Sequence, residues 1–214
     1  MTITTNPAPA RTDVAPAIPT PTAGATRQVR RAGVILSVGT LSWAAAMITV
    51  GASPEGSVAI TIGDLSAVPF QIGLFALVGA QLRTRATGLS KAARGMLRVE
   101  FGLLFLATVW SVLHGAVPAW RDDVWLGILD AFWPLSMLGM FVISVKLAFA
   151  GRWRGLGRFW PLVAESWAVV MVPIAVIFQS SAMTGVLGGA HLLIGYCALG
   201  LILALKPEVT GATD

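Results

Sequence analysis

The sequence predicts an all-α protein, a polytopic membrane bundle of six transmembrane helices. Of its 214 residues, 56% are hydrophobic and only 12% are charged, and the mean hydropathy is +0.78. Soluble domains carry about 25% charged residues, so this chain lacks the polar side chains that coat a water-exposed surface. Long uncharged runs recur along it, and short basic clusters separate them. These observations exclude a free cytosolic enzyme and a secreted disulfide scaffold.

The chain begins with a polar segment, residues 1–31, which is rich in Pro, Thr and Ala and has no aromatic residue. Such a segment buries too little apolar surface to offset its ordering entropy, so we predict a disordered cytoplasmic tail. The first apolar span follows at about residues 32–50. A signal sequence cleaved near residues 50–52 is the alternative. An apolar region of about 19 residues exceeds the usual 7–15 and favours a retained span.

The remaining spans follow from the length of helix that crosses a bilayer, about 20 apolar residues. Residues 166–205 contain no charge over 40 positions, which is enough for two passes with a turn at Gln179–Ser181. The transmembrane domain is therefore expected over residues 32–205 and a short cytoplasmic tail over 206–214. The later spans are predicted at about 62–82, 97–118, 125–149, 159–178 and 182–205.

The basic residues test this threading independently. Six spans place 14 of the 15 Lys and Arg residues on one side and Arg121 alone on the other. By the positive-inside rule, both termini are cytoplasmic and the protein is a multi-pass protein of the plasma membrane. Trp120 and Trp125 are expected at the outer interface, and Trp153 and Trp160 at the inner one. Because the charges are explained by topology, the net charge of +5 does not predict a nucleic-acid partner.

A weak internal similarity relates the second and third predicted spans to the fourth and fifth. Pro69 precedes Glu100 by 31 residues, and Pro134 precedes Glu165 by the same interval. This spacing indicates a tandem repeat of a helical hairpin in one orientation.

Two short segments carry a family resemblance. Trp133–Gly139 (WPLSMLG) and Gly151–Gly155 (GRWRG) resemble small six-span integral membrane proteins of GC-rich bacteria. Arg outnumbers Lys 12 to 3 and Asn occurs once, which also indicates a GC-rich bacterial genome. The resemblance implies the six-span fold and no activity.

Ionisable residues inside spans are costly in lipid and usually face the bundle interior. Five polar residues fall in the outer half of the predicted bundle, and together they form a candidate site for a proton or a ligand: Asp64, His114, Asp130, Gln179 and His191. The alternative is structural, with each histidine bonded to a neighbouring helix. His114 and His191 on different helices would also suit a metal or haem, although no local spacing fixes such a pair, and we predict neither a metal nor a cofactor.

Two further acidic residues, Glu100 and Glu165, lie nearer the cytoplasmic side. We expect them to form ion pairs at the inner rim with Arg98 and Lys146, whose long side chains reach the interface.

Gly185 and Gly189 have the small-residue spacing that lets helices approach closely. Packing within the bundle is the favoured interpretation, and a homo-oligomer contact is the alternative.

The chain has no phosphate loop, dinucleotide fingerprint, zinc-protease motif or nucleophile elbow, so no catalytic residue is predicted. Apart from the lipid bilayer, no partner or solute is identified by the sequence. Three hypotheses remain. The first is a non-catalytic scaffold, sensor or binding protein, the second a small proton- or solute-coupled carrier with its polar site in the outer half, and the third a membrane redox protein that uses His114 and His191.

Overall fold

The computed structural model of the chain describes residues 24–179 and 181–212. Within these ranges the secondary structure consists of helices and contains no strand. Six helical stretches are long and apolar enough to cross a membrane. The predicted all-α fold with six spans is therefore confirmed.

The first three spans are uninterrupted and the last three are each built from two helices in succession. The continuous spans are α1 (Ala25–Val50), α2 (Ser57–Arg83) and α3 (Lys91–Ala116). The composite spans are α4 (Val124–Asp130) with α5 (Phe132–Ala150), α6 (Leu156–Glu165) with α7 (Trp167–Phe178), and α8 (Ser181–Leu192) with α9 (Ala198–Leu205). Helices α8 and α9 are joined by a π-helical segment, η2 (Leu193–Cys197), and two 3-10 turns complete the described chain, η1 (Pro118–Trp120) and η3 (Pro207–Thr210).

Local chemistry accounts for two of these interruptions. Pro134 has no N–H to offer the carbonyl group of Asp130, and its ring crowds that carbonyl, so α4 ends at Asp130. Ser166 Oγ donates a hydrogen bond of 2.8 Å to the carbonyl oxygen of Val163, the group that an unbroken helix would offer to Trp167 N–H. Both breaks therefore arise from the local sequence.

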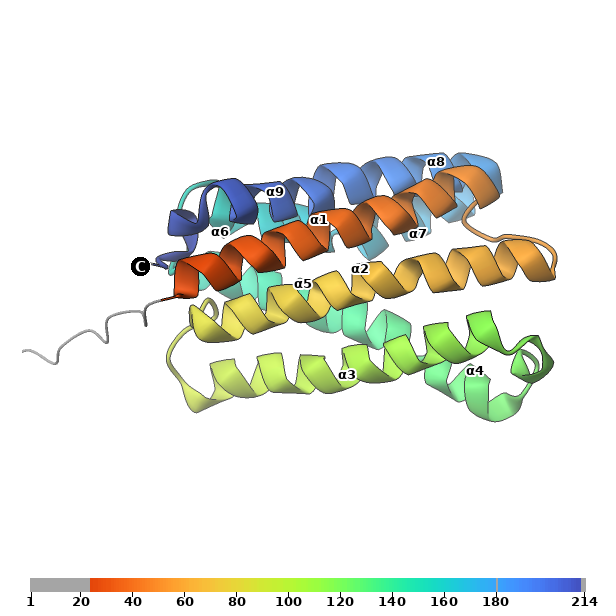
Figure 1. Cartoon of the computed structure of the whole chain (residues 1–214), viewed down its shortest axis with the longest axis horizontal. Helices are drawn as coiled ribbons and strands as arrows, with labels where there is room; N and C mark the ends of the chain where they lie inside the picture. Colours follow the sequence, from red (N-terminus) through yellow and green to blue (C-terminus); the bar gives the residue numbers. More distant parts are fainter. Residues whose placement is uncertain (1–23, 180, 213–214) are drawn as a thin grey trace, which may run out of the picture.

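Helix α1 lies between α2 on one side and α8 with α9 on the other (Figure 1). Its close neighbours approach at glycines. Gly39 faces the carbonyl group of Pro69 on α2, and Gly33 faces that of Gly200 on α9, each at a distance that leaves no room for a Cβ atom. Small residues thus let α1 pack backbone to backbone against two helices.

The surface of the bundle is apolar where it would meet lipid. Large hydrophobic side chains are exposed on every span, for example Val38, Ile72, Phe105, Leu138, Val176 and Ile194. The buried core lies inside the bundle and includes Phe70, Leu77, Leu104, Leu147 and Leu199. An apolar exterior of this extent fits a bilayer and not water.

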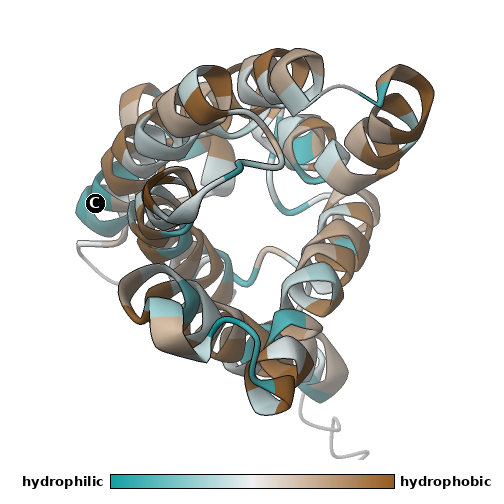
Figure 2. Ribbon diagram, turned by 90° about the vertical axis from the view of Figure 1, so that its right-hand side faces the viewer, coloured by the Kyte–Doolittle hydropathy of each residue, from teal (hydrophilic) through white to brown (hydrophobic). Residues whose placement is uncertain are grey.

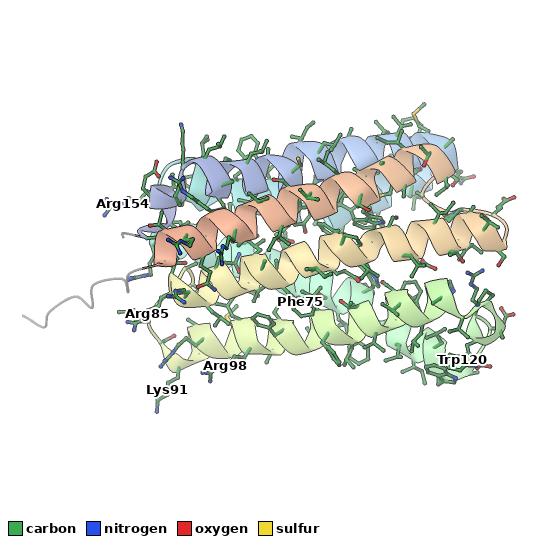
Figure 3. All side chains as sticks on the ribbon, viewed as in Figure 1. Phe75, Arg85, Lys91, Arg98, Trp120 and Arg154 are labelled. Atoms are coloured by element: carbon green, nitrogen blue, oxygen red, sulfur yellow. The ribbon has the colours of Figure 1, made fainter. Side chains whose placement is uncertain are left out.

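The two ends of the bundle differ in charge. Arg85, Lys91, Arg98 and Arg154 lie at one end, which we call the basic end, and Trp120 lies at the other, the Trp120 end (Figure 3). Figure 2 looks along the bundle from the Trp120 end and shows the helices arranged around its axis.

Near the basic end the structure corrects two sequence predictions, the disordered state of residues 25–31 and the interfacial position of Trp153, and it adds detail to the predicted C-terminal tail. Residues 25–31, assigned to a disordered tail, form the first turns of α1, while residues 1–23 lie outside the described residues. The final segment is folded through residue 212, since Thr210 and Ala212 are buried and Arg154 N–H donates to the carbonyl oxygen of Val209 at 2.7 Å. Trp153 is fully buried and donates to Thr84 Oγ1 at 2.9 Å, so it is not an interfacial ring.

Candidate functional site

A cavity of about 700 Å³ opens at the Trp120 end. Its walls come from α1, α2, α3, α4, α5, α7 and α8, and its mouth from residues 51–55 together with Gln179 and Ser181. The α1–α2 connection is tied to the start of α8, because Ser181 Oγ accepts from Ser53 N–H at 2.9 Å and donates to the Ser53 carbonyl oxygen at 3.0 Å. The cavity reaches Trp133, nine residues along the chain from the start of α4, a depth of roughly 13 Å at the helical rise per residue.

Aromatic and thioether side chains dominate the inner wall. Four tryptophans contribute, from four different spans, together with three methionines. Three of the indole rings touch one another: Trp43 lies 5.3 Å from Trp133 and 5.9 Å from Trp167, measured between ring centroids. Trp43 also stacks on Phe70 at 4.9 Å. The full set is Trp43, Trp110, Trp133, Trp167, Met47, Met137 and Met171.

The charged groups of the cavity are all acidic. Asp64, Asp130 and Glu55 belong to its lining, and none of the described lining residues is a lysine or an arginine. Glu55 lies at the mouth, Glu55 and Asp130 are both exposed, and Asp64 is half-buried. The cavity therefore presents a negative entrance above an aromatic interior.

Asp64 is held by a histidine. His114 Nδ1 lies 2.6 Å from Asp64 Oδ2, and the two side chains are 22% and 17% exposed. The imidazole ring stacks on Trp110 at 4.8 Å between centroids, with an interplanar angle of 18°. The stacking and the hydrogen bond together fix the carboxyl group of Asp64 at the cavity wall.

Arg121 binds the C-terminal end of α3, next to the bonded pair of His114 and Asp64. Its guanidinium group donates to the carbonyl oxygen of His114 at 2.8 Å, to Thr61 Oγ1 at 2.7 Å and to Ser57 Oγ at 3.0 Å. It thereby places a positive charge at the carbonyl end of α3, where the helix dipole favours a cation. These contacts occupy the guanidinium group outside the cavity.

A hydrogen-bonded group forms the floor of the cavity. Ser111 Oγ accepts from Gln71 Nε2 at 2.8 Å and from Trp133 Nε1 at 3.0 Å, and it donates to the carbonyl oxygen of Ala107 at 3.2 Å. Gln71 and Ser111 are both buried. Ser111 thus uses its donor and its acceptor sites, and it joins α2, α3 and α5 beneath the cavity.

The structure brings together most, but not all, of the predicted outer polar residues. Asp64, Asp130 and Gln179 line the cavity, and His114 is one hydrogen bond away. His191 does not line it: Nε2 lies 3.1 Å from Ser166 Oγ, where α6 meets α7. His191 is ten residues into α8 and His114 two residues from the end of α3, so their depths differ by roughly 12 Å.

The two histidines are therefore not placed to share a metal or haem iron. In the described ranges, moreover, no group of three or more His, Cys, Asp and Glu side chains is arranged to hold a metal ion.

The two inner acidic residues differ from their predicted role as members of ion pairs. Glu100 and Glu165 are 1% and 3% exposed, and each accepts a hydrogen bond from a neutral hydroxyl group, that of Ser136 at 2.5 Å and that of Tyr196 respectively. Arg98 and Lys146 are exposed on other faces of their helices, and among the described contacts neither forms a salt bridge with these acids. Two residues along a helix turn a side chain by about 200°, which separates Arg98 from Glu100.

Sequence reasoning missed the aromatic wall and the hydroxyl partner of Glu165. Tryptophans in membrane proteins usually mark the interfaces, so rings near the middle of a span were not expected to gather around a cavity. The π-helical segment gave no sequence signal either, although it brings Tyr196 to Glu165 and exposes the carbonyl oxygens of Ile194 and Gly195 to Trp160 Nε1 at 3.0 and 3.1 Å. Such segments often occur at functional sites.

The structure places Gly185 and Gly189 on the face of α8 that meets α1. A Cβ atom at Gly185 would overlap the carbonyl oxygen of Met47, and one at Gly189 would crowd Ile48 and Ala44. These glycines therefore have a packing role inside the bundle.

Comparison with known proteins finds no matching family model, no matching curated protein and no matching solved structure. The resemblance in residues 133–139 and 151–155 stays a prediction. The chemistry of the cavity has to be inferred from its own residues.

Proposed function

We propose that this multi-pass membrane protein binds a small organic cation in the cavity at the Trp120 end. The observation that carries the proposal is the combination of four indole rings inside the cavity with three carboxyl groups and no basic residue in its described lining. A cation over an indole face gains about 0.5–2 kcal/mol, more as water is removed. The carboxyl groups at the entrance attract cations and repel anions.

The size of the cavity sets the class of ligand. Small-molecule sites usually enclose about 300–1,000 Å³, and this one encloses about 700 Å³. That volume exceeds the needs of a bare metal ion, and indole and thioether groups suit a ligand with an apolar surface. A quaternary or protonated amine that carries an aromatic or aliphatic group meets both conditions.

We also propose that the basic end faces the cytoplasm and that the cavity opens on the outer face of the plasma membrane. The distribution of Lys and Arg between the two ends supports this orientation. Trp120 and Trp125, both exposed and 5.7 Å apart between ring centroids, suit the outer interface.

The direct test is isothermal titration of the full chain in phosphatidylcholine nanodiscs, with empty nanodiscs as the blank. The probes are phenyltrimethylammonium and its uncharged isostere tert-butylbenzene. We expect saturable binding of the cation and at least about tenfold weaker binding of the isostere, since only the cation gains from the rings and carboxyl groups. Equal affinities, or no saturable binding of the cation, would contradict the proposal.

Replacement of one carboxyl group tests the acidic entrance. Asp130→Asn should weaken phenyltrimethylammonium binding by roughly three- to tenfold, in keeping with one exposed charge interaction of about 1 kcal/mol. Asp122→Asn is the matched control, because Asp122 is exposed at the same end but does not line the cavity. Equal effects of the two variants would point to a general surface potential and not to a site.

The aromatic wall has its own matched pair of variants. Trp167 lines the cavity and its Nε1 has no hydrogen-bond partner in the described structure, so its ring is replaceable without breaking such a bond. Trp167→Leu should weaken binding of the cation roughly three- to tenfold, and Trp167→Phe, which keeps an aromatic face, should weaken it less. If Leu and Phe behave alike, the ring does not act through its π face.

A carrier is the second candidate, favoured by the one-sidedness of the cavity. Its lining contains no residue of the basic end, and buried Leu77, Met140 and Leu147 occupy the interior of the bundle on that side. Alternating-access carriers show such one-sided cavities. Uptake of phenyltrimethylammonium into proteoliposomes, reduced by Asp130→Asn, would support transport. Uptake no faster than in protein-free liposomes would restrict the function to binding.

A further inference from the structure

Two buried carboxyl groups lie deeper in the bundle than the cavity. Glu100 on α3 and Glu165 at the end of α6 are 1% and 3% exposed, and they lie close enough for an electrostatic interaction. Each has one oxygen bonded to a hydroxyl group: Ser136 Oγ donates to Glu100 Oε1 at 2.5 Å, and Tyr196 OH donates to Glu165 Oε2. Neither carboxyl group has a lysine or arginine partner in the described residues.

Three unpartnered polar atoms in this region are acceptors, and the indole Nε1 of Trp167, two residues after Glu165, is an unpartnered donor that bonds to none of them. Glu100 Oε2, Glu165 Oε1 and Gln71 Oε1 are buried and have no hydrogen-bond partner. Gln71 has committed one N–H to Ser111, and the hydroxyl groups of Ser136 and Tyr196 are used. Buried polar groups are normally satisfied, so three unpartnered acceptors indicate hydrogen atoms that the protein does not supply.

A small void lies among these groups. It has a volume of about 10 Å³, and its lining includes Gln71, Ser136, Glu165 and Tyr196. Glu100 is connected to it through the hydrogen bond from Ser136. This volume is at the lower limit for one water molecule, which brings two hydrogen atoms. One water therefore supplies hydrogen atoms for two of the three acceptors.

The electrostatic balance of the two carboxyl groups also favours one added proton. Two carboxylates buried within electrostatic range of each other without a cation would each pay a desolvation cost and would repel each other. One added proton leaves a single negative charge between them and supplies the missing donor. A cation other than a proton would need more ligands, and the described residues provide no group arranged to hold a metal.

We propose that Glu100 and Glu165 form a proton-binding site with one water molecule in the bundle core. The proton comes from bulk water and forms an O–H bond on a free carboxylate oxygen, with no bond broken in the protein and no redox partner. The hydroxyl groups of Ser136 and Tyr196 position the two carboxyl groups. The site is joined to the cavity floor through Gln71, whose amide donates to Ser111.

Other titratable groups near this site are few. From η2, Tyr196 donates to Glu165, and the Cys197 carbonyl oxygen accepts from Ser37 Oγ at 3.0 Å. From α8, His191 bonds to Ser166, the residue after Glu165. Asp64, His114 and Asp130 lie on the far side of the Ser111 floor, and Arg98 and Lys146 are exposed on the outside of the bundle.

Infrared spectroscopy tests the site without any ligand, so its outcome is independent of cation binding in the cavity. The full chain is measured in dodecyl maltoside, which has no carbonyl group, in H₂O and D₂O at pH 7, where exposed carboxyl groups are ionised. We expect the C=O stretching band of a protonated carboxylic acid, which shifts in D₂O and disappears as the pH is raised. The Glu100→Gln/Glu165→Gln variant should lose the band, and Asp130→Asn should retain it.

Two conservative variants keep both carboxyl groups and guard against a folding defect. Ser136→Ala removes the hydroxyl donor to Glu100, and Tyr196→Phe removes the donor to Glu165. The variant that removes the hydrogen bond to the protonated carboxyl group should move its C=O band to higher frequency. No band at pH 7 in the natural sequence, a band that survives replacement of both glutamates, or a band that neither conservative variant moves would each overturn the proposal.

Discussion

Arg121 shows how one side chain determines the character of the candidate site. Arg121 directly follows Trp120 in the chain, and five acceptors from α2 and α3 surround its guanidinium group. A free arginine at the mouth would neutralise Asp64 or Asp130 and favour anions. Because its donors are committed to Ser57, Thr61 and the end of α3, Arg121 acts on Asp64 only at a distance and forms no salt bridge with a carboxyl group of the cavity among the described residues.

Replacement of Arg121 should therefore weaken the junction of α2 and α3. Arg121→Gln removes the charge at the end of α3 and most of these hydrogen bonds, and we expect the free energy of unfolding to fall by about 1–3 kcal/mol. Thermal unfolding in detergent measures the change. Arg94→Gln is the control, since the Arg94 side chain is exposed, and it should change stability by less than about 0.5 kcal/mol. Equal shifts in the two variants would refute a structural role for Arg121.

At the level of single residues, the sequence predicts only part of the candidate site. Asp64, His114, Asp130 and Gln179 were predicted to lie near one another because helical spacing and depth are readable from the chain. The bond between His114 and Asp64 was not predicted, and His191 was assigned to the wrong neighbourhood. The sequence gives the depth of a polar residue along its span, but its side chain can still face either of two neighbouring helices. The packing of the bundle decides which of the two helices it faces.

At the scale of the element, α1 organises the bundle. It packs against α2, α8, α9 and η2, and at the first three of these contacts a glycine brings two backbones together. Helix association in lipid depends on such close packing because lipid tails compete for apolar contacts. The interrupted helices have a different role: the breaks beside Asp130 and Glu165 place the two acidic side chains at points where helical hydrogen bonding is already disturbed.

The glycine contact between α1 and α8 is directly testable. Gly185→Ala would put a Cβ atom onto the Met47 carbonyl oxygen, a backbone atom that cannot rotate away, and we expect a loss of about 1–3 kcal/mol in unfolding free energy. Gly102→Ala is the matched change, since a Cβ atom there meets nothing within 4 Å, and it should be neutral or slightly stabilising. Detergent-induced unfolding followed by circular dichroism distinguishes them. If both variants are neutral, α1 and α8 do not pack as closely as described.

At the scale of the whole molecule, the two ends of the bundle carry charged groups of opposite sign. The basic end carries most of the Lys and Arg residues, and the Trp120 end carries the acidic cavity. In the proposed orientation the acidic cavity faces the outside, where we propose that it binds cations, and the basic end faces the anionic inner leaflet, which attracts basic segments.

Cysteine labelling of intact cells tests this orientation. In a Cys197→Ala background, Trp120→Cys should react with a membrane-impermeant maleimide, while Lys91→Cys and Arg154→Cys should react only after permeabilisation. These three sites lie at opposite ends of the bundle (Figure 3), and Cys197 is the sole native cysteine. Labelling of Lys91→Cys and Arg154→Cys from opposite sides would contradict the six-span threading itself.

The sequence by itself determined that the surroundings are a lipid bilayer, that six helices are long enough to cross it, and that the basic and acidic residues gather at different ends. These properties follow from the length and hydropathy of each segment, which are local and additive along the chain. The tertiary structure decided which side chains meet: Asp64 with His114, Glu165 with Tyr196, and tryptophans from four spans around one cavity. Such pairings depend on the order of the helices around the bundle axis and on their rotation, and packing sets both through backbone contacts at glycines and through irregular helical turns.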